Sequence, residues 1–339
     1  MPHRPRGWKL AWPGYGAWVS QLPWIGAEEI GRLLPVTEAA DALERALLRG
    51  LDPAQDPARI GVDVAAGELL LMPSSSEESV GVKIVALAAG NAARGLPRIH
   101  GVYLLLHAET LVPEALLDGS ALTALRTPAV SALAVRRLAR PDAARLVVFG
   151  SGPQAWGHVQ AVLAVRPVTE VAVVGLSAER AGALAARVAE LGVAVSVPEE
   201  LNAVIDAVRA GEVIVCATSS AVPLFDGALV QDSACVVAVG SHRPDRRELD
   251  ANLMGRAHVV VEDRATALRE AGDVAMAVQE GFLEVHGCET LAELVSTAGA
   301  GKLLAGQRAD RRPTVFKSVG MGWQDLVVAT EVNRRWGAP

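Results

Sequence analysis

The sequence predicts an α/β protein that combines a Rossmann-type doubly wound parallel sheet with a second domain of the α+β class. The chain has 339 residues, more than a single hydrophobic core usually supports. Hydrophobic residues make up 51% of it and charged residues 21%, a balance that suits buried parallel strands covered by helices. From residue 145 onward, short apolar runs alternate with helical patterns, which is typical of consecutive βα units.

Residues 1–127 show a different pattern from the rest of the chain. Apolar side chains recur at helical spacing over residues 27–49 and predict two short helices, with Thr37 as a cap. Four strand-like runs follow, separated by glycine, proline and serine, at residues 59–64, 68–72, 81–87 and 101–107. These runs predict an antiparallel or mixed sheet.

The junction between the two domains is predicted at Thr127 and Pro128. Threonine is a favourable N-cap and proline suits the first helical turn, so we expect a helix to begin here. Beyond it, strands are predicted at residues 145–149, 171–174, 193–197, 213–217, 236–239 and 257–261, and helices from residue 154 and over 178–191 and 201–210. A last helix over residues 314–336 is expected to return to the first domain. The predicted division is 22–127 with 313–339, then 128–312, with an N-terminal arm of residues 1–21.

Charge and composition argue against several classes of partner. The net charge is −6 and no Lys/Arg block is long enough to follow a phosphate backbone, so nucleic acid is not expected. No apolar run approaches the ~20 residues that span a bilayer, and Pro13, Gly14 and Gly16 interrupt any export signal. The three cysteines form no C-x-x-C pair, and the histidines lack ligand spacing. We therefore expect a cytoplasmic protein with no metal centre and no membrane partner.

A glycine-rich turn follows the first strand of the βα series. The apolar run Val147-Val148-Phe149 leads directly into a G-x-G-x-x-A pattern that opens a helix, Gly150-Ser151-Gly152-Pro153-Gln154-Ala155. In such a turn the first glycine permits a tight bend and the second lets the backbone approach a diphosphate, while helix N–H groups face the anion. The pattern predicts a dinucleotide site, with an ordinary strand-to-helix turn as the alternative.

The end of the next strand bears on which dinucleotide binds. NAD-binding units usually place a carboxylate there, about 20 residues beyond the turn, to hold the adenosine ribose. Here the strand ends in Val174-Gly175-Leu176-Ser177, without an acid. Ser177 and Arg180 are suited to a ribose 2′-phosphate instead, although a solvated helix position is the more common role of an arginine. We therefore expect NADP(H) to be preferred, with NAD(H) as the alternative.

Several further motifs follow one another along the chain. They are Met72-Pro73, Gly81-Val82-Lys83, residues 122–127, the glycine-rich turn, residues 240–250 and residues 314–320. In combination they resemble the ornithine cyclodeaminase and mu-crystallin family, over nearly the whole chain from about residue 22. The resemblance implies a homodimer, in which residues 22–127 and 313–339 form a substrate-binding and dimerisation domain beside a dinucleotide-binding domain of residues 128–312. It also implies a small substrate that carries an α-carboxylate next to an amine or imine.

The same resemblance assigns roles to individual residues. It implies that Arg59, Lys83 and Arg126 surround the substrate carboxylate and the nicotinamide, where guanidinium groups fit a planar carboxylate. Lys83 is also a candidate catalytic residue, because an isolated lysine within an apolar strand is often functional. The remaining assignments are Val319 at the substrate and His100, Thr218, Val239, Arg246 and Ser318 along the cofactor, each with an ordinary structural role as the alternative.

One position departs from the cyclodeaminase pattern. Cyclodeaminase members present an aspartate two residues beyond the glycine that follows the strand ending at Val239, where it donates and accepts protons. Here that position is His242, and Asp245 lies three residues further on. Reduction of a preformed imine needs hydride delivery and a proton source rather than a fixed carboxylate base. His242 is therefore a candidate proton donor near neutral pH, or else a histidine that binds loop backbone.

These residues together favour an NAD(P)H-dependent reductase of small ketimines, such as 1-pyrroline-2-carboxylate or 1-piperideine-2-carboxylate. Hydride would pass from nicotinamide C4 to the imine carbon, while His242, Lys83 or water protonates the nitrogen. Three alternatives stay open. They are an ornithine or lysine cyclodeaminase that recycles NAD, an alanine or opine-type dehydrogenase, and a mu-crystallin-like protein that binds ligands without turnover.

Overall fold

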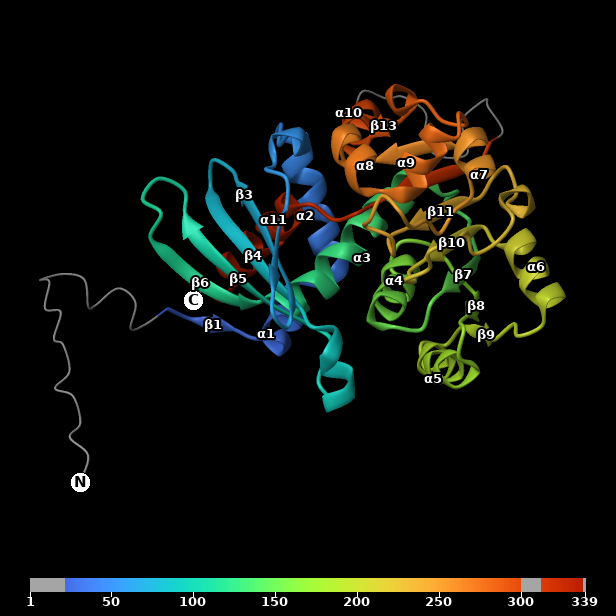
Figure 1. Ribbon diagram of the computed structural model, residues 1–339, viewed down its shortest axis with the longest axis horizontal. Coiled ribbons are helices and arrows are strands. Elements are labelled where there is room, and N and C mark those ends of the chain that lie inside the picture. The colour runs from blue at the N-terminus through green and yellow to red at the C-terminus, as the bar shows by residue number, and fades with distance from the viewer. Residues whose placement is uncertain (1–21, 300–311, 338–339) are drawn as a thin grey trace, which may run out of the picture.

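The computed structural model describes residues 22–299 and 312–337; residues 1–21, which hold the predicted N-terminal arm, 300–311 and 338–339 lie outside the described residues. Two sheets dominate the fold, one of six strands and one of eight. They form two lobes that lie side by side (Figure 1). The predicted α/β class, a Rossmann-type sheet with a second α+β unit, is confirmed.

The six-stranded sheet is mixed, as the sequence predicts. Its order is β1-β6-β5-β4-β3-β2; β1 pairs with β6 in parallel and the other pairs are antiparallel. The strands are Trp24–Ile25 (β1), Ile60–Val64 (β2), Gly67–Ser75 (β3), Ser79–Leu87 (β4), Ile99–His107 (β5) and Pro113–Asp118 (β6). Strands β1 and β6 are not predicted from the sequence, because β1 has only two residues and β6 begins with proline and glutamate.

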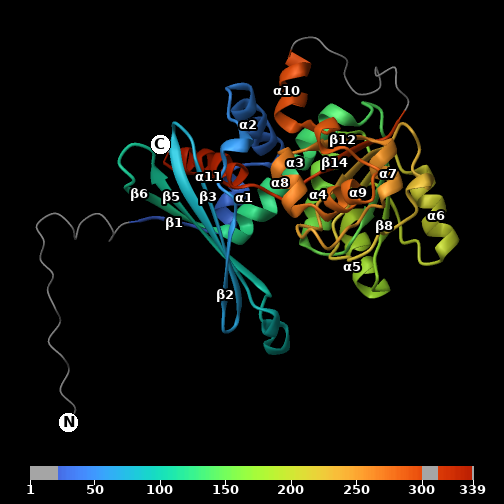
Figure 2. The same ribbon diagram turned by 45° about the horizontal axis from the view of Figure 1, so that its top comes forward.

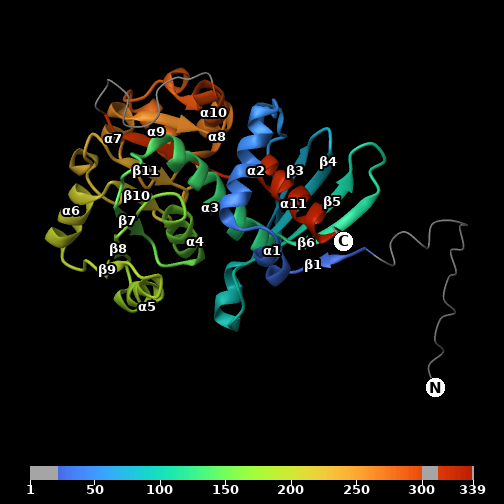
Figure 3. The same ribbon diagram turned by 180° about the vertical axis from the view of Figure 1, so that it is seen from behind.

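One face of the mixed sheet is covered by helices. The helices of this lobe are Ala27–Leu33 (α1), Val36–Leu48 (α2), Gly119–Leu138 (α3) and Gly322–Trp336 (α11). Helices α3 and α11 contact the strands, and α1 and α2 pack on these two helices (Figure 3). The cross-strand row that contains Met72, Lys83, Tyr103 and Leu117 is buried beneath them. The strand register therefore places a lysine in the interior of the lobe.

Two predicted helix starts are wrong. Helix α2 begins at Val36 with Pro35 in the cap position, so Thr37 is not its cap. Helix α3 begins at Gly119, because the Asp118 carboxylate accepts the backbone N–H groups of the first turn. Thr127 and Pro128 therefore lie inside α3 rather than at its start.

Helix α3 tolerates Pro128 in its middle because the neighbouring helix fits around it. Proline donates no N–H, so the Ala124 carbonyl loses its partner in the helix. Gly157 packs at this point, where a Cβ would come within 2.7 Å of the Pro128 ring. As a result α3 runs without a break between the lobes, in contact with β4, β5 and β6 on one side and β11 and β14 on the other.

The eight-stranded sheet is parallel and doubly wound. Its order is β13-β12-β14-β11-β10-β7-β8-β9. The strands are Arg145–Phe149 (β7), Glu170–Val174 (β8), Ala194–Ser196 (β9), Val213–Cys216 (β10), Cys235–Ala238 (β11), His258–Val261 (β12), Glu289–Thr290 (β13) and Thr314–Lys317 (β14). The chain runs outward from β7 to β9 and then returns to the other side of β7 with β10. Such a reversal creates the crevice at the carboxyl ends of the strands in which ligands of this fold bind.

Helices connect the strands of the parallel sheet and cover its faces. They are Pro153–Leu163 (α4), Ala178–Ala189 (α5), Leu201–Ala210 (α6), Ala251–Arg256 (α7), Arg264–Glu270 (α8), Gly272–Gln279 (α9) and Leu291–Gly299 (α10). Short 3-10 helices occur at Pro53–Gln55, Ala89–Arg94, Gly227–Leu229 and Val285–Gly287. Within the described part of the chain, no helix combines the length and apolar character that crossing a membrane requires.

The prediction of one helix over residues 314–336 is wrong at its start. Residues Thr314–Lys317 form strand β14, which is buried between β11 and β12. Here Val315 and Phe316 complete the hydrogen-bonded sheet, and this tertiary pairing outweighs the local pattern. The chain then crosses to the mixed sheet and continues as α11 (Figure 2). The segment 318–321 therefore lies between the two lobes.

Candidate active site

The glycine-rich turn has the geometry that a diphosphate site needs. Gly150 follows β7 with φ of +119°, and a Cβ there would lie 2.5 Å from the Ala217 carbonyl oxygen. Gly152 is the N-cap of α4, and a Cβ on it would meet no atom within 4 Å. Pro153 and Gln154 open the helix, whose first-turn N–H groups have no acceptor within the helix. These features fit the close approach of a dinucleotide diphosphate.

The end of β8 lies beside this turn and carries no acid. A Cβ on Gly175 would lie 3.7 Å from the Ser151 hydroxyl, so the two segments are neighbours. Ser177 caps α5, and its hydroxyl accepts the Arg180 N–H at 3.3 Å. The Arg180 side chain is exposed at the same helix terminus. A serine, an arginine and a helix N-terminus thus gather where a carboxylate would otherwise hold the ribose.

A buried glutamate that the sequence analysis missed joins the loops after β10 and β11. Glu248 accepts hydrogen bonds from the backbone N–H and hydroxyl of Thr218, each at 2.7 Å, and from the Gly240 N–H at 2.7 Å. Burial raises its pKa, and Lys317 opposes that rise. Asp273 in turn accepts the Glu248 N–H at 2.7 Å and pairs with Lys317 at 2.9 Å.

This buried network fixes the segment that carries His242 and Arg246. Lys317 also donates to the Ser241 carbonyl at 2.7 Å. Val239, at the end of β11, is partly buried against the core, and Arg246 is exposed, with its Nη1 3.5 Å from the Ser219 carbonyl. His242 is exposed, yet enough protein lies beside its ring that burial, followed by the charges of Arg59 and Lys317, lowers its pKa. The imidazole is therefore mostly neutral at neutral pH.

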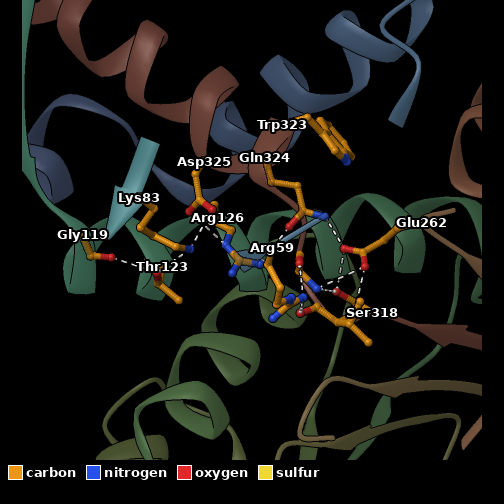
Figure 4. Close-up of polar contacts among 12 residues, drawn as sticks. Arg59, Lys83, Gly119, Thr123, Arg126, Glu262, Ser318, Trp323, Gln324 and Asp325 are labelled. Carbon is orange, nitrogen blue, oxygen red and sulfur yellow. Dashed lines mark hydrogen bonds and ion pairs between the residues drawn. The ribbon is translucent and has the colours of Figure 1, made fainter. Parts of the chain in front are cut away.

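Lys83 is the centre of a second cluster, at the mixed sheet. Its side chain is 1% exposed, and Nζ lies 2.7 Å from Asp325 Oδ2 and 3.2 Å from Thr123 Oγ1 (Figure 4). The Thr123 hydroxyl donates to the Gly119 carbonyl at 2.8 Å, so its oxygen can accept from lysine. Burial lowers the Lys83 pKa to about 8, Asp325 opposes this fall, and Arg126 adds to it. An ammonium with this pKa is charged at pH 7 and releases its proton readily.

Arg126 shares the same carboxylate. Its Nε lies 3.2 Å from Asp325 Oδ1 and its Nη1 donates to Gln324 Oε1 at 2.8 Å. The guanidinium packs on Gly320, whose φ is +76°, and a Cβ at Gly320 would collide with it. Both cations therefore depend on Asp325, which is completely buried.

Residues 318–321, called here the crossing segment, are held from both lobes. Arg59, from the mixed sheet, donates to the carbonyls of Val319 and Gly320 at 3.0 and 2.8 Å, and its Nε lies 2.6 Å from Glu270 of α8. The crossing segment also binds Glu262, which accepts the Ser318 hydroxyl at 2.8 Å and the Val319 N–H at 2.9 Å. Glu262 bonds to Gln324 as well (Figure 4). The structure thus brings Arg59, Lys83, Arg126, Ser318 and Val319 into one connected set.

A family model described as the ornithine cyclodeaminase/mu-crystallin family matches residues 25–338. The chain belongs to this family. The resemblance seen in the sequence motifs is therefore confirmed, and the two clusters lie on the parts of the chain that the family model covers.

Members of the family and their solved structures resemble the chain over most of its length. A Delta(1)-pyrroline-2-carboxylate reductase of Bacillus cereus (strain ZK / E33L) is 38% identical over 264 residues, 77% of this chain and 79% of that protein. The Thermococcus litoralis Delta(1)-pyrroline-2-carboxylate reductase in complex with NADH and L-proline has a TM-score of 0.81 at 28% identity, covering 92% of this chain and 96% of that one. An archaeal alanine dehydrogenase dimer with bound NAD has a TM-score of 0.83 at 27% identity, covering 93% and 95%.

One residue assigned from the family resemblance stands apart from the others. His100 is exposed near the start of β5. His100 pairs with Ala86 of β4, and Ala86 is three residues from Lys83. Side chains alternate between the two faces along a strand, so His100 and Lys83 lie on opposite faces of the sheet. Its role at the cofactor stays a prediction. Among the described residues, no group of three or more acidic, histidine or cysteine side chains is arranged to hold a metal ion.

Proposed function

We propose that this protein is an NAD(P)H-dependent reductase of small ketimines of the 1-pyrroline-2-carboxylate or 1-piperideine-2-carboxylate type, which yields cyclic or N-substituted amino acids. The observation that carries the proposal is the buried Lys83, whose pKa is lowered to about 8. Lys83 and Arg126 share the Asp325 carboxylate. Arg59 binds the segment that leaves the carboxyl edge of the parallel sheet. The relative with 38% identity is named as a reductase of this class. Cationic donors suit the substrate carboxylate, and the lysine supplies an acidic proton.

Each residue has a role that its chemistry supports. Arg59 and Arg126 offer guanidinium N–H groups to the substrate carboxylate and thereby fix the angle of the ketimine. Val319, whose carbonyl accepts from Arg59, would offer an apolar contact to the substrate ring. When bound, the dinucleotide supplies the hydride. Gly150 makes the tight bend, and backbone N–H groups of Ser151, Gly152 and Gln154 would hold the diphosphate.

Lys83 is the proton donor that we propose for the substrate nitrogen. Its ammonium is charged at neutral pH and lies in the cluster with both arginines. His242 is the weaker candidate, because its lowered pKa leaves little imidazolium at neutral pH. We propose that His242 instead lines the site from the parallel-sheet lobe.

NADP(H) is the dinucleotide that we propose as preferred, with NAD(H) as a possible substitute. Ser177, Arg180 and the N-terminus of α5 offer donors to a 2′-phosphate, and Gly175 leaves the ribose without a carboxylate. Two structural relatives hold NADH or NAD, so both NADPH and NADH belong in the assay.

The test is a spectrophotometric assay of the purified protein with NADPH or NADH and a panel of cyclic ketimines. Loss of reduced-nicotinamide absorbance with 1-pyrroline-2-carboxylate or 1-piperideine-2-carboxylate is the expected result. Ammonia release from ornithine or lysine without net change in dinucleotide would instead identify a cyclodeaminase. Tight dinucleotide binding with no turnover of any imine or amino acid would identify a binding protein.

Replacing Gly152 with alanine is expected to weaken dinucleotide binding about ten-fold, ~1.4 kcal/mol, without loss of stability. A Cβ at Gly152 meets no atom within 4 Å in the folded chain, but it would occupy the space through which a diphosphate approaches the turn. Fluorescence titration with NADPH and NADH measures the affinity, and thermal unfolding measures the stability. Gly182→Ala on α5, where a Cβ also meets no atom within 4 Å, is the matched control. Unchanged affinity of Gly152→Ala would contradict the assignment.

We also propose a homodimer, formed through the face of the mixed sheet that α3 and α11 leave uncovered. In this arrangement residues 22–127 and 313–339 act as the substrate-binding and dimerisation domain, and residues 128–312 bind the dinucleotide. The uncovered face, called here the open face, is lined by apolar side chains that point away from Lys83: Trp24, Ile60, Val62, Val82, Leu104 and Leu116. Trp24 is 54% exposed and Ile60 is 52% exposed. Contact of such large apolar side chains with water is unfavourable, and a partner subunit that covers them would remove this contact.

Introducing a charge on the open face is expected to yield a monomer. Leu104→Lys would place a charged group at the centre of the buried interface, where it has no counterion. Sedimentation velocity gives the mass of the parent and the variant. Leu191→Lys, at an exposed site after α5, should leave the mass unchanged. A parent protein that sediments as a monomer would contradict the dimer.

A further inference from the structure

The buried position of Lys83 raises the question of how it regains its proton. Reduction of a ketimine consumes one hydride and one proton in each turnover, and this inference rests on that proposed function. The side chains of Lys83 and Asp325 are 1% and 0% exposed. A lysine that gives up its proton at such a depth must be supplied again through other protein groups.

Tyr103 places a buried hydroxyl on the face of the sheet that carries Lys83. It is the register partner of Lys83 on the neighbouring strand, and it is completely buried. Its ring extends over Gly81, where a Cβ would collide with the hydroxyl, so the glycine makes room for it. The hydroxyl has no hydrogen-bond partner among residues 22–299 and 312–337. Buried hydroxyl groups nearly always have one, which indicates a site for water or for a moving proton.

Ser74 and Asp56 continue from Tyr103 toward the surface. Ser74 is the register partner of Gly81, the residue over which the Tyr103 ring extends. Ser74 and Tyr103 therefore share one face of the sheet, and the Ser74 hydroxyl donates to Asp56 Oδ1 at 2.6 Å.

Asp56 connects the cavity at the surface with the start of α11. Its Oδ2 accepts the Trp323 N–H at 2.6 Å, two residues before Asp325. It also lines a small cavity, open to solvent, together with Met72 and Gly322. By itself, the hydrogen bond from the Trp323 N–H is that of a helix cap, which needs no titratable group. Asp56 also lies between the solvent-exposed cavity and the side chain of Ser74, where a titratable group can pass on a proton.

Asp56 can exchange protons in the physiological range. Burial raises its pKa to about 6, Asp325 and Glu262 add to the rise, and the hydrogen bonds from Ser74 and Trp323 oppose it. The charged groups that face it are Asp325 of α11, Glu262 after β12, Arg59 of its own segment, and Arg269 and Glu270 of α8. The same two carboxylates, Asp325 and Asp56, act after burial to raise the pKa of Tyr103, which places the hydroxyl within the field of both.

We propose that Asp56, Ser74 and Tyr103, with water bridging at the unpaired Tyr103 hydroxyl, form a proton-supply route from the solvent cavity to the Asp325–Lys83 pair. The ends of the route are an ionisable group at the cavity and the buried donor of the reaction, and its middle is two hydroxyl groups over Gly81.

The transfers balance without any redox partner. An Nζ–H bond of Lys83 breaks as the N–H bond forms on the substrate nitrogen, and the electron pair stays on Nζ. Asp56 takes a proton from water in the cavity. Each hydroxyl then accepts a proton on its oxygen and releases the hydrogen that it carried, and the Asp325 carboxylate passes the last proton to Nζ. One proton enters from solvent for each proton consumed.

Tyr103→Phe and Asp56→Asn test the route, because each keeps the shape of the side chain and removes the transferable proton. Both are expected to lower kcat about ten-fold or more while the KM for the ketimine stays nearly unchanged, and to enlarge the solvent deuterium isotope effect on kcat. In Asp56→Ala, added imidazole is expected to restore the rate in proportion to its concentration. Asp63→Asn, an exposed aspartate on β2, is the matched control and should behave as the parent.

A second measurement needs no turnover. Carbon-13 NMR of labelled aspartate carboxyl groups should show Asp56 titrating near pH 6 in the parent. Titration of Asp56 below pH 4, or a kcat and isotope effect in Tyr103→Phe equal to those of the parent, would overturn the route. A parent protein that oxidises no NAD(P)H with any ketimine would refute the proposed function, and this is visible before any variant is made.

Discussion

Replacing Lys83 with methionine is expected to lower kcat about 1,000-fold, within the range that general acid catalysis contributes. Methionine keeps the length of the side chain and removes the ammonium that lies 2.7 Å from Asp325. Because Asp325 then loses one of its two buried cations and keeps only Arg126, the variant should unfold at a lower temperature than the parent. Steady-state kinetics at saturating dinucleotide, with dinucleotide affinity measured separately, distinguish the loss of the donor from a loss of binding.

The pH dependence of the parent follows from the same residue. The pKa of Lys83 is lowered from 10.5 to about 8, so the ammonium is present at pH 7 and is lost as the pH rises above about 8. We expect kcat to fall about ten-fold per pH unit beyond that point. His242→Asn should reduce kcat far less than Lys83→Met. The reverse order of the two variants would make His242 the donor and contradict the assignment of Lys83.

Asp325→Asn is expected to have the second large effect, on stability as well as on turnover. The Asp325 carboxylate lies between Lys83 at 2.7 Å and Arg126 at 3.2 Å, and the asparagine amide is nearly isosteric but uncharged. Removing one partner from a buried ion pair costs about 3–5 kcal/mol. Because Asp325 supports the charged form of Lys83, its loss lowers the Lys83 pKa further, and less ammonium is present at neutral pH.

Urea unfolding and kcat measured at several pH values test this prediction. Asp245→Asn is the control, because the Asp245 side chain is 65% exposed and such surface changes shift stability by about 0.5 kcal/mol or less. An Asp325→Asn protein as stable and as active as the parent would show that the two cations do not depend on this carboxylate.

Much of the parallel sheet could be predicted from sequence, because its strands are buried on both faces. Residues 145–149 and 201–210 were predicted with the bounds of β7 and α6. Continuous apolar runs and amphipathic helices carry this information locally. Strand β14 could not be found in the same way, since its four residues pair with strands that are distant in the chain.

The cations of the candidate site could be located from sequence, but most of their partners could not. Lys83 and Arg126 lie in motifs, and Arg59 follows from the family resemblance. Asp325 and Glu270 lie on helices, where an acid usually faces solvent. One signal was available. A lysine within an apolar strand is buried only with an anion, so Lys83 implied a carboxylate partner. The position of that partner depended on α11 returning to the mixed sheet, which only the structure shows.

The continuous helix α3 links the two lobes and contains one proline, Pro128. The helix lacks one backbone hydrogen bond at Pro128, so bending there disrupts least. Arg126 lies just before this pivot and therefore travels with the mixed sheet, while the glycine-rich turn travels with the parallel sheet. Rotation about Pro128 would change the separation between Arg126, the guanidinium that we propose for the substrate carboxylate, and the turn that we propose for the dinucleotide.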